Sequence, residues 1–251
     1  MNVVLAIATW EFYRICEAKG IPTYKFWGTV GTIALISGSW FFYRRGDRVE
    51  LSYDFDILIL LVFTVGVFLR QFPQKLNPQG IATMAVTLFG LLYVAWLGNF
   101  ITRINFASPQ GRYLVMYLTV VTKFTDIGAY LIGSTLGRHK MIPRISPKKT
   151  WEGTAGGIVF AMGSSVLCVK WMPGTLGAVG LTLPHALILG LLLGAAAVVG
   201  DLAESLIKRE AGVKDSGTIL PGHGGALDLV DSLLFTRSEE HTSELQSHSD
   251  L

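Results

Sequence analysis

A polar stretch near the C-terminal end of the chain holds residue types that could bind a metal ion and phosphate groups. In GDLAESLIKRE, four polar residues recur at helical spacing and would share one stripe of a helix: Asp201, Glu204, Ser205 and Lys208. Charged residues and a histidine then surround a glycine-rich run: Lys214, Asp215, His223, Asp228 and Asp231. Glycines let backbone N–H groups approach an anion. Carboxylates beside phosphate suit Mg²⁺, so the pattern predicts metal-assisted phosphate chemistry.

A second polar stretch, GRHKMIPRISPKKTWEG, is strongly basic. Its cations are Arg138, Lys140, Arg144, Lys148 and Lys149. Ser146 followed by Pro147 predicts the N-cap and first residue of a helix, whose N-terminus would attract phosphate together with the two lysines. Anchoring to anionic lipid headgroups, at about 1 kcal/mol per basic residue, is the alternative, and the loop could serve both roles.

A third group of polar residues lies inside an apolar segment. Lys123, Asp126 and Tyr130 fall at i, i+3 and i+7, on one helix face. Charges in hydrocarbon are costly and usually face a cavity or a partner, so these residues predict either a functional site or an internal ion pair between Lys123 and Asp126. Glu204 and Lys208 could likewise form an exposed i, i+4 pair that contributes about 0.2–0.5 kcal/mol.

The elements that must position these groups are membrane helices. Apolar residues make up 51% of the 251 residues and charged residues 16%, where a soluble domain has about 25% charged. With a mean hydropathy of +0.47, this composition excludes a disordered chain. The net charge of +3 gives no reason to expect a nucleic-acid partner. The sequence has neither a P-loop nor a G-x-S-x-G motif, which argues against a P-loop ATPase and against serine acyl chemistry.

Six apolar segments approach or reach the roughly 20 residues that a bilayer span needs. They cover residues 26–43, 55–69, 81–101, 113–133, 153–172 and 180–200, with a partial stretch at 1–10. Gly133 and Gly137 have the small-xxx-small spacing that lets two helices pack closely. The sequence therefore predicts an all-α fold, a polytopic transmembrane helical bundle with about six spans.

The distribution of Lys and Arg predicts the orientation of these spans. The connections at 11–25, 70–80, 134–152 and 201–214 hold 13 basic residues. The opposite set holds six: Arg44, Arg45, Arg48, Arg103, Arg112 and Lys170. By the positive-inside rule the first set is cytoplasmic. The basic stretch and the acidic, glycine-rich stretch then share one side, which suits a polyphosphate that reacts with a lipid.

We divide the chain into N-terminal transmembrane helices (1–112), a catalytic transmembrane region with two cytoplasmic polar loops (113–236) and a tail (237–251). The tail from Arg237, RSEEHTSELQSHSDL, has no aromatic residue and no periodicity. It looks like the translation of a sequencing adapter and is set aside from fold reasoning. We then expect a C-terminal truncation, with a final helix that begins near Leu233 missing.

The run from Ser205 to Asp231 resembles one family closely. Its pattern, S-x-x-K-R-x-x-x-x-K-D-S-G-x-x-x-P-G-H-G-G-x-x-D-x-x-D, is similar to the signature of phosphatidate cytidylyltransferases, also called CDP-diacylglycerol synthases. The resemblance extends to DIGAYLIG (126–133), to SPKKTWEG (146–153) and to Gly200 and Asp201. It covers roughly residues 125–232, whereas the first 110 residues resemble the family only in hydrophobic spacing.

The resemblance implies that the phosphate of phosphatidate attacks the α-phosphorus of CTP, giving CDP-diacylglycerol and pyrophosphate in phospholipid biosynthesis. Such in-line displacements depend mainly on positioning and charge stabilisation. The family pattern implies that Asp201 and Asp228 hold a divalent metal ion, with Mg²⁺ expected, and it leaves open a second, monovalent cation. It also implies a multi-pass protein of a bacterial-type inner membrane with a cytoplasmic active site, and leaves open a homodimer.

The resemblance assigns roles to further residues. The catalytic residues are expected to be Asp126, Asp201, Lys208, Asp228 and Asp231. The substrate-binding residues are expected to be Ser146, Lys148, Lys149, Ser205, Arg209, Lys214, Asp215, His223, Gly224 and Gly225. For Asp126 and Asp231, metal ligation and orientation of other groups both stay open. His223 could donate to a phosphate oxygen or pack structurally.

Two residues depart from the family pattern. Ala226 stands where a larger apolar residue is usual, which is a minor packing change. Leu229 stands where the family has Arg, in D-R-x-D, and loss of that cation would remove a charge-assisted hydrogen bond of about 1.5–3 kcal/mol. We expect either impaired activity or a sequence read error at this position.

Two other functions fit parts of the pattern. A CTP-dependent lipid kinase would transfer the γ-phosphate of CTP to a lipid. A transporter would use Lys123 and Asp126 as a mid-membrane ion relay. In a transporter the SPKKTWEG and KDSG elements have no obvious task.

Overall fold

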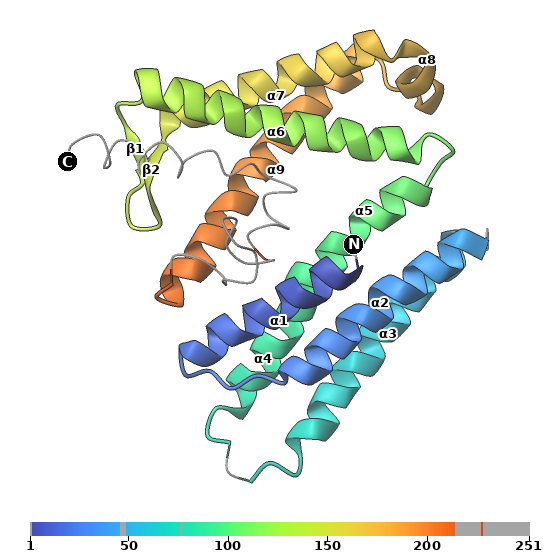
Figure 1. Ribbon diagram of the computed structural model, residues 1–251, viewed down its shortest axis with the longest axis vertical. Helices are drawn as coiled ribbons and strands as arrows, with labels where there is room; N and C mark the ends of the chain where they lie inside the picture. Colours follow the sequence, from blue (N-terminus) through green and yellow to red (C-terminus); the bar gives the residue numbers. More distant parts are fainter. Residues whose placement is uncertain (1, 46–48, 76, 214–226, 228–251) are drawn as a thin grey trace, which may run out of the picture. The chain divides into compact units, whose positions relative to one another are not determined.

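The computed structural model describes residues 2–45, 49–75, 77–213 and 227, which are almost entirely helical (Figure 1). The helices are α1 (Asn2–Ala18), α2 (Lys25–Arg45), α3 (Val49–Gln71), α4 (Gly80–Gly90), the π-helical η1 (Leu91–Trp96), α5 (Leu97–Phe106), α6 (Gly111–Leu136), α7 (Trp151–Trp171), α8 (Pro173–Leu176), the 3-10 helix η2 (Gly177–Val179) and α9 (Leu183–Glu210). Within these residues β1 (Lys140–Ile142) and β2 (Ser146–Thr150) form a two-stranded hairpin. The predicted all-α class is confirmed.

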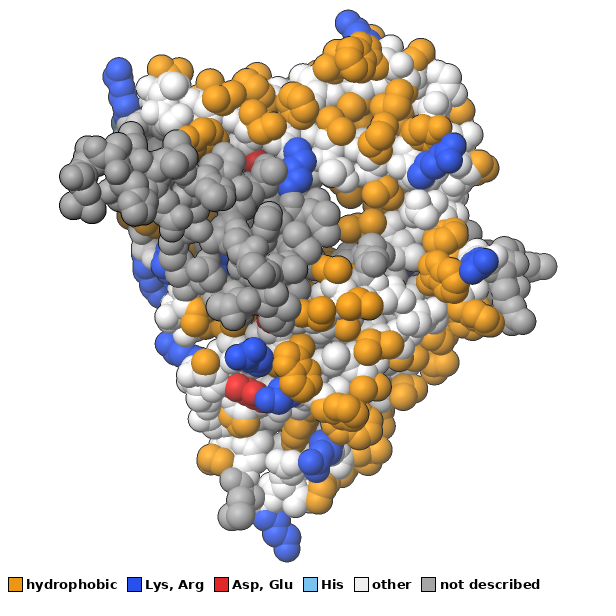
Figure 2. All heavy atoms as spheres, in the orientation of Figure 1, with side chains coloured by type: hydrophobic (Ala, Val, Ile, Leu, Met, Phe, Trp, Pro, Cys, Tyr) orange, Lys and Arg blue, Asp and Glu red, His pale blue; other side chains and the backbone are white. Residues whose placement is uncertain are grey.

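Four helical stretches in the described part of the chain are long and apolar enough to cross a membrane. They are Gly80–Phe106, which joins α4, η1 and α5, and Gly111–Leu136, Trp151–Trp171 and Leu183–Glu210. Helices α2 and α3 form over the other two predicted spans. Large apolar side chains face outward, including Ile81 at 82% and Trp171 at 80% exposure. Figure 2 shows hydrophobic side chains spread widely over one face, with few acidic ones. Such extended apolar surfaces are those of a polytopic membrane protein.

The described residues divide into two compact units. The first comprises residues 2–117, 172–181, 204–213 and Leu227, and the second comprises residues 118–171 and 182–203. Helix α9 therefore contributes its first twenty or so residues to the second unit and its last turns to the first. Each unit has its own packing.

In the first unit, α1, α2 and α4 pack around the side chain of Tyr13. Its hydroxyl donates a hydrogen bond to the carbonyl oxygen of Thr87 on α4 at 2.7 Å. A Cβ atom at Gly28 on α2 would lie 2.2 Å from the Tyr13 hydroxyl, and one at Gly90 on α4 would lie 2.5 Å from its ring. Glycine at both positions therefore allows the two helices to approach the ring closely.

A buried polar cluster connects α2, α3 and α5 in the same unit. Asp56 on α3 is 1% exposed and accepts hydrogen bonds from Ser39 Oγ (2.5 Å) and Asn99 Nδ2 (3.2 Å). Arg103 on α5 forms an ion pair with the same carboxylate. The assignment of Arg103 to an external loop is therefore wrong, because this arginine is buried within a helix. A buried charge needs a partner of opposite sign, and Asp56 supplies it.

In the second unit, small residues bring α6, α7 and α9 together. A Cβ atom at Gly133 on α6 would lie 3.4 Å from the Cα atom of Gly153 on α7. A Cβ atom at Gly137 would lie 2.7 Å from Thr150 Oγ1. Further along α7, Ser165 Oγ donates a hydrogen bond to the carbonyl oxygen of Ala186 on α9. The predicted helix packing is thus confirmed for Gly133, whereas Gly137 lies against Thr150 of β2.

Gly153→Ala should destabilise the second unit. Its new Cβ atom would lie 2.8 Å from the carbonyl oxygen of Ala129 and 3.0 Å from the Cα atom of Gly133, so the backbones of α6 and α7 must separate. Overpacking of this kind costs about 1–3 kcal/mol. We expect the thermal unfolding midpoint of the purified protein in detergent to fall by several degrees.

Gly163→Ala, on the same helix, is the matched control. A Cβ atom at Gly163 meets no heavy atom within 4 Å among the described residues. Because alanine favours a helix over glycine by about 1 kcal/mol, this variant should melt at or slightly above the wild-type temperature. Equal melting of both variants at or above wild type would show that the α6–α7 contact is not tightly packed.

Candidate active site

The basic stretch folds as a hairpin between α6 and α7, at one end of both helices (Figure 1). Strands β1 and β2 pair antiparallel. Glu152, in the first turn of α7, closes the base of the hairpin: its carboxylate accepts hydrogen bonds from the backbone N–H groups of Arg138 and His139, each at 3.2 Å. The same carboxylate contacts His139 Nδ1 at 2.5 Å. These contacts fix the strands that carry the predicted phosphate-binding residues.

The helix that the sequence predicts from Ser146 begins instead at Trp151. Residues Ser146–Thr150 form β2, and Thr150 caps α7, because its Oγ1 accepts a hydrogen bond from the N–H of Gly153 at 3.1 Å. Thr150 is 4% exposed and stands three residues before Gly153, so it reaches an N–H group of the first turn that has no partner within the helix. Ser146, Lys148 and Lys149 therefore lie on a strand and not at a helix N-terminus.

Lys149 on β2 forms an ion pair with Asp201 on α9. The side chains are 22% and 37% exposed, so both charged groups lie partly inside the second unit. Lys148, the preceding residue on β2, is exposed, as expected where successive side chains of a strand point to opposite faces. The structure thus joins two predicted site residues, one from each of the two polar stretches of the sequence.

Helix α9 extends to Glu210, ten residues beyond the end of the predicted span. Asp201, Ser205 and Lys208 therefore lie on one continuous helix and recur along one face of it, as their spacing predicts. Arg209 is exposed in the last turn of α9. A helix holds these side chains in a fixed order along its axis, which a flexible loop would not do.

Glu204 on α9 is buried, which corrects its interpretation as an exposed residue. It is 3% exposed and forms an ion pair with Lys208, the i+4 residue. The Lys208 side chain is 19% exposed. Because exposed i, i+4 pairs contribute only tenths of a kcal/mol, burial makes this pair more important for placing the ammonium group than its spacing suggests.

Asp126 lies half-buried on α6, in the second unit. Lys123 is also half-buried on this helix, while Tyr130 is 41% exposed. The i, i+3, i+7 spacing on a helix is confirmed, because α6 covers all three residues. The choice between an internal ion pair and a functional site stays open.

Seven predicted site residues lie outside the described residues: Lys214, Asp215, His223, Gly224, Gly225, Asp228 and Asp231. The departure at Leu229 and the tail from Arg237 lie outside them too. Their roles stay predictions from the sequence. The eight predicted site residues that are described are Asp126, Ser146, Lys148, Lys149, Asp201, Ser205, Lys208 and Arg209.

The donor atoms around Asp201 are compatible in type with Mg²⁺. Magnesium binds through one or two carboxylates together with substrate phosphates and water, and Asp201 is a partly exposed carboxylate beside a lysine. Among the described residues no group of three or more His, Cys, Asp and Glu side chains comes together as a metal cage. A protein that shares the metal with its substrate does not require such a cage.

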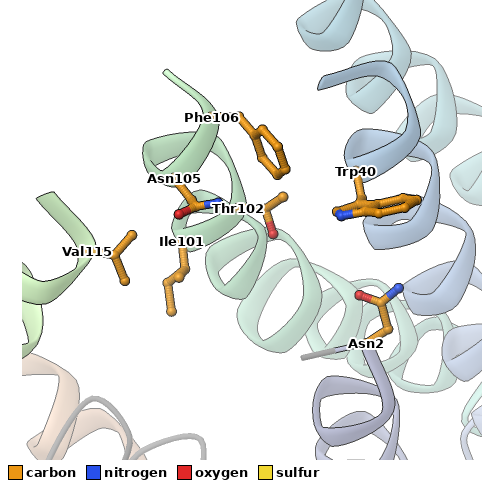
Figure 3. A pocket seen from close by; sticks show the side chains of 7 residues that line it. All are labelled: Asn2, Trp40, Ile101, Thr102, Asn105, Phe106 and Val115. Atoms are coloured by element: carbon orange, nitrogen blue, oxygen red, sulfur yellow. The ribbon is translucent and has the colours of Figure 1, made fainter. Parts of the chain in front are cut away.

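A cavity of about 450 Å³ lies in the first unit, between α1, α2, α5 and the start of α6 (Figure 3). The side chains that line it include Trp40, Thr102, Asn105 and Phe106. None of the predicted site residues lines it. The cavity therefore has no part in the candidate site.

Sequence reasoning missed Glu152 as a residue that organises the site, and it missed the burial of Glu204. Glu152 could have been found as an acidic residue in the first turn of a helix, where carboxylates are favoured. Glu204 belongs to the same helical stripe as Asp201, which borders an apolar run. That position could have indicated partial burial.

Comparison with known proteins relates the chain to one family. Its sequence matches the cytidylyltransferase family over residues 1–239, which includes the first 110 residues. The uncharacterised protein YnbB of Escherichia coli K12 is 43% identical, over 94% of this chain and 85% of its own length. A protein of Bacillus subtilis 168 named phosphatidate cytidylyltransferase is 32% identical, over 93% of this chain and 84% of its own length. A protein of the same name from Brucella suis is 40% identical over 58% of this chain and 52% of its own length.

Proposed function

Because this chain belongs to the cytidylyltransferase family, we propose that it condenses CTP with phosphatidate to give CDP-diacylglycerol and pyrophosphate. The observation that carries the proposal is the ion pair between Lys149 and Asp201, which joins the basic hairpin to the polar face of α9. Relatives named phosphatidate cytidylyltransferase support the choice of the lipid substrate.

The reaction is an in-line displacement at phosphorus. An oxygen of the phosphatidate phosphate forms a bond to the α-phosphorus of CTP. The bond from that phosphorus to the oxygen bridging to the β-phosphate breaks, and pyrophosphate leaves with the electron pair. No covalent intermediate with the protein is required, so the protein's task is to align the two phosphates and to balance their negative charge.

The described cations are suited to this task. Lys149 is held at the site by Asp201, and Lys208 is held by Glu204, so each ammonium group has a restricted position before substrate binds. Lys148 and Arg209 are exposed, and their positive charges suit the phosphates of an incoming nucleotide. Restricted cations stabilise the developing charge with little reorganisation.

Asp201 and Asp228 would hold Mg²⁺. When bound, the ion would neutralise phosphate charge and polarise the reacting phosphorus. Asp201 contributes a hard oxygen donor to such a site and orients Lys149 as well. Lys214 and Asp215, with the glycines at 224 and 225, would contact the nucleotide phosphates.

The membrane supplies the second substrate. Phosphatidate is anchored in the bilayer by its acyl chains, and the length and apolar character of α6, α7 and α9 support a site at the membrane boundary. We propose that this boundary is the cytoplasmic face of a bacterial inner membrane, because Lys and Arg are concentrated in the connections on that side.

Radiolabel transfer tests the function. Membranes that contain the full chain are supplied with phosphatidate, Mg²⁺ and CTP labelled at the α-phosphorus, and the label in the organic phase is counted. We expect organic-phase label that depends on phosphatidate and disappears with EDTA. Membranes without the protein give the background.

The competing functions give different products. A CTP-dependent lipid kinase would leave α-label in the aqueous phase and would move γ-label into lipid. A transporter would show ion flux that is lost in Asp126→Asn and needs no CTP. Either pattern would replace the proposed reaction.

A further inference from the structure

A second cavity, of about 780 Å³, lies in the first unit at the end where α1 joins α2 and α3 joins α4 (Figure 1). Both connections line it, together with the last turn of α3 and the first turn of α4. The polar residues that line it include Thr23, Tyr24, Arg70, Lys75 and Asn77. Its volume lies within the range of about 300–1,000 Å³ that is usual for ligand sites. None of its lining residues belongs to the candidate active site, so the proposed reaction gives this cavity no task.

The lining of this cavity is positively charged. Arg70 and Lys75 form no ion pair with any other described residue. No Asp or Glu is among the described residues that line the cavity. Glu17 accepts a hydrogen bond from the lining residue Thr23, but its carboxylate is already paired with Lys25 at 2.8 Å. An anion that enters the cavity would therefore meet two cations that do not have to leave another partner.

The guanidinium group of Arg70 lies over an aromatic ring at the wall of the cavity. Its central carbon is 5.8 Å from the centre of the Tyr24 ring. Tyr24 is fixed in turn, because its hydroxyl donates a hydrogen bond to Gln71 on α3 and its backbone N–H donates one to Thr87 Oγ1 on α4 at 3.1 Å. An arginine placed in this way can present two N–H groups to a phosphate in the bidentate geometry that phosphate favours.

The position of Lys75 is set by backbone hydrogen bonds that continue from the end of α3. The N–H of Gln74 donates to the carbonyl oxygen of Gln71 at 3.0 Å. The N–H of Lys75 donates to the carbonyl oxygen of Pro73 at 3.1 Å. The two cations are thus carried by one turn at the end of a single helix, which keeps both of them at the same cavity.

Apolar side chains beside the cavity favour a lipid over a soluble anion. Phe72, two residues after Arg70, is 76% exposed, and Ile81 in the first turn of α4 is 82% exposed. The apolar stretch Gly80–Phe106, which is long enough to span a membrane, begins at the cavity. Cations beside exposed apolar side chains match a ligand that carries a phosphate next to acyl chains. The connections also belong to the set predicted to be cytoplasmic, and the cytoplasmic leaflet is the one rich in anionic lipid.

We propose that this cavity binds the phosphate headgroup of an anionic phospholipid. Arg70 and Lys75 contact the phosphate, and Tyr24 supports the guanidinium group. The acyl chains lie along the exposed apolar side chains at the ends of α3 and α4. This site gives the N-terminal helices a binding role of their own, and it does not depend on the proposed function.

Equilibrium binding to a labelled lipid tests the proposal. The purified full chain, in a non-ionic detergent and without CTP, is titrated into phosphatidylglycerol that carries a fluorophore on one acyl chain, and anisotropy gives the Kd. The double variant Arg70→Gln with Lys75→Gln should raise the Kd at least about tenfold, because each cation near a lipid phosphate contributes to binding. Phosphatidylcholine with the same label should bind wild type at least about tenfold more weakly, since its headgroup has no net charge.

Arg44→Gln with Arg112→Gln is the matched control, because it removes the same charge from the same unit. Each of these exposed arginines also lies over an aromatic ring, Arg44 over Trp40 and Arg112 over Tyr113, and neither lines the cavity. This variant should keep the wild-type Kd within about threefold, as expected for a general charge effect. Arg70→Lys keeps the charge without the bidentate geometry and should weaken binding less than Arg70→Gln does.

Four outcomes would overturn the proposal. The first is a wild type that does not prefer phosphatidylglycerol to phosphatidylcholine. The second is an equal loss of binding in the cavity variant and in the matched control. The third is displacement of the lipid by excess inorganic phosphate, which would make the cavity a site for a soluble anion. The fourth is binding that survives in the cavity variant but is lost in Arg144→Gln with Lys148→Gln, which would assign the headgroup to the basic hairpin.

Discussion

Asp201→Asn should lower kcat/KM for CTP by about 100- to 1,000-fold, the range seen when one preorganised charge-stabilising group is removed. The substitution keeps the size of the side chain and removes its charge. It removes a ligand that we propose for Mg²⁺ and the partner of Lys149 at the same time. The activity should be measured as organic-phase label from α-labelled CTP, at several Mg²⁺ concentrations and in membranes with matched protein content.

Glu210→Gln is the control for this substitution. Glu210 is an exposed acidic residue in the last turn of the same helix and lies outside the predicted site. Its activity should stay within about fivefold of wild type, because exposed ion pairs contribute at most about 1 kcal/mol. A similar loss of activity in both variants would mean that the total acidic charge of α9 matters. It would contradict a specific role for Asp201.

A double-mutant cycle distinguishes a site role of the ion pair from a purely structural one. Lys149→Gln, Asp201→Asn and the double variant are compared in activity and in thermal stability. If the two side chains only stabilise each other, the double variant should be no worse than either single variant. If both also act on substrate, as we propose, the losses of activity should compound while the losses of stability overlap. Wild-type activity in the double variant would contradict the assignment.

Leu229→Arg should raise kcat/KM about 10- to 150-fold. The related signature has Arg at this position, and a charge-assisted hydrogen bond of about 1.5–3 kcal/mol converts to that range. The gain is expected because phosphate chemistry benefits from an added planar, bidentate cation. Initial rates of wild type and variant are compared in the same membrane assay, at saturating phosphatidate.

Leu229→Lys and Leu229→Met provide the controls for that gain. Lysine supplies charge without the bidentate geometry of arginine and should recover only part of it. Methionine conserves size and lack of charge and should match wild type. If arginine leaves the activity unchanged or lowers it, the family signature does not describe how this chain uses position 229.

The location of the helices could be predicted from the sequence alone. Runs of apolar residues near the length of a bilayer span predicted six segments, and a helix forms over each of them. The order of the polar groups along α9 could be predicted as well, because fixed spacings report which groups share one face of a helix. Asp201, Ser205 and Lys208 recur along one helix face as their spacing requires.

Only the tertiary structure decided which distant groups meet. Lys149 pairs with Asp201, Arg103 is buried against Asp56, and the N–H of Leu227 reaches Glu11. These pairings cannot be predicted from the spacing of residues along the chain. They depend on how closely the helices pack, for example where Gly133 faces Gly153. The residue at which α7 begins also depends on contacts in the folded structure. Ser146 and Pro147 have the local pattern of a helix start, but strand pairing with β1 holds Ser146 in the hairpin, and Thr150 caps the helix instead.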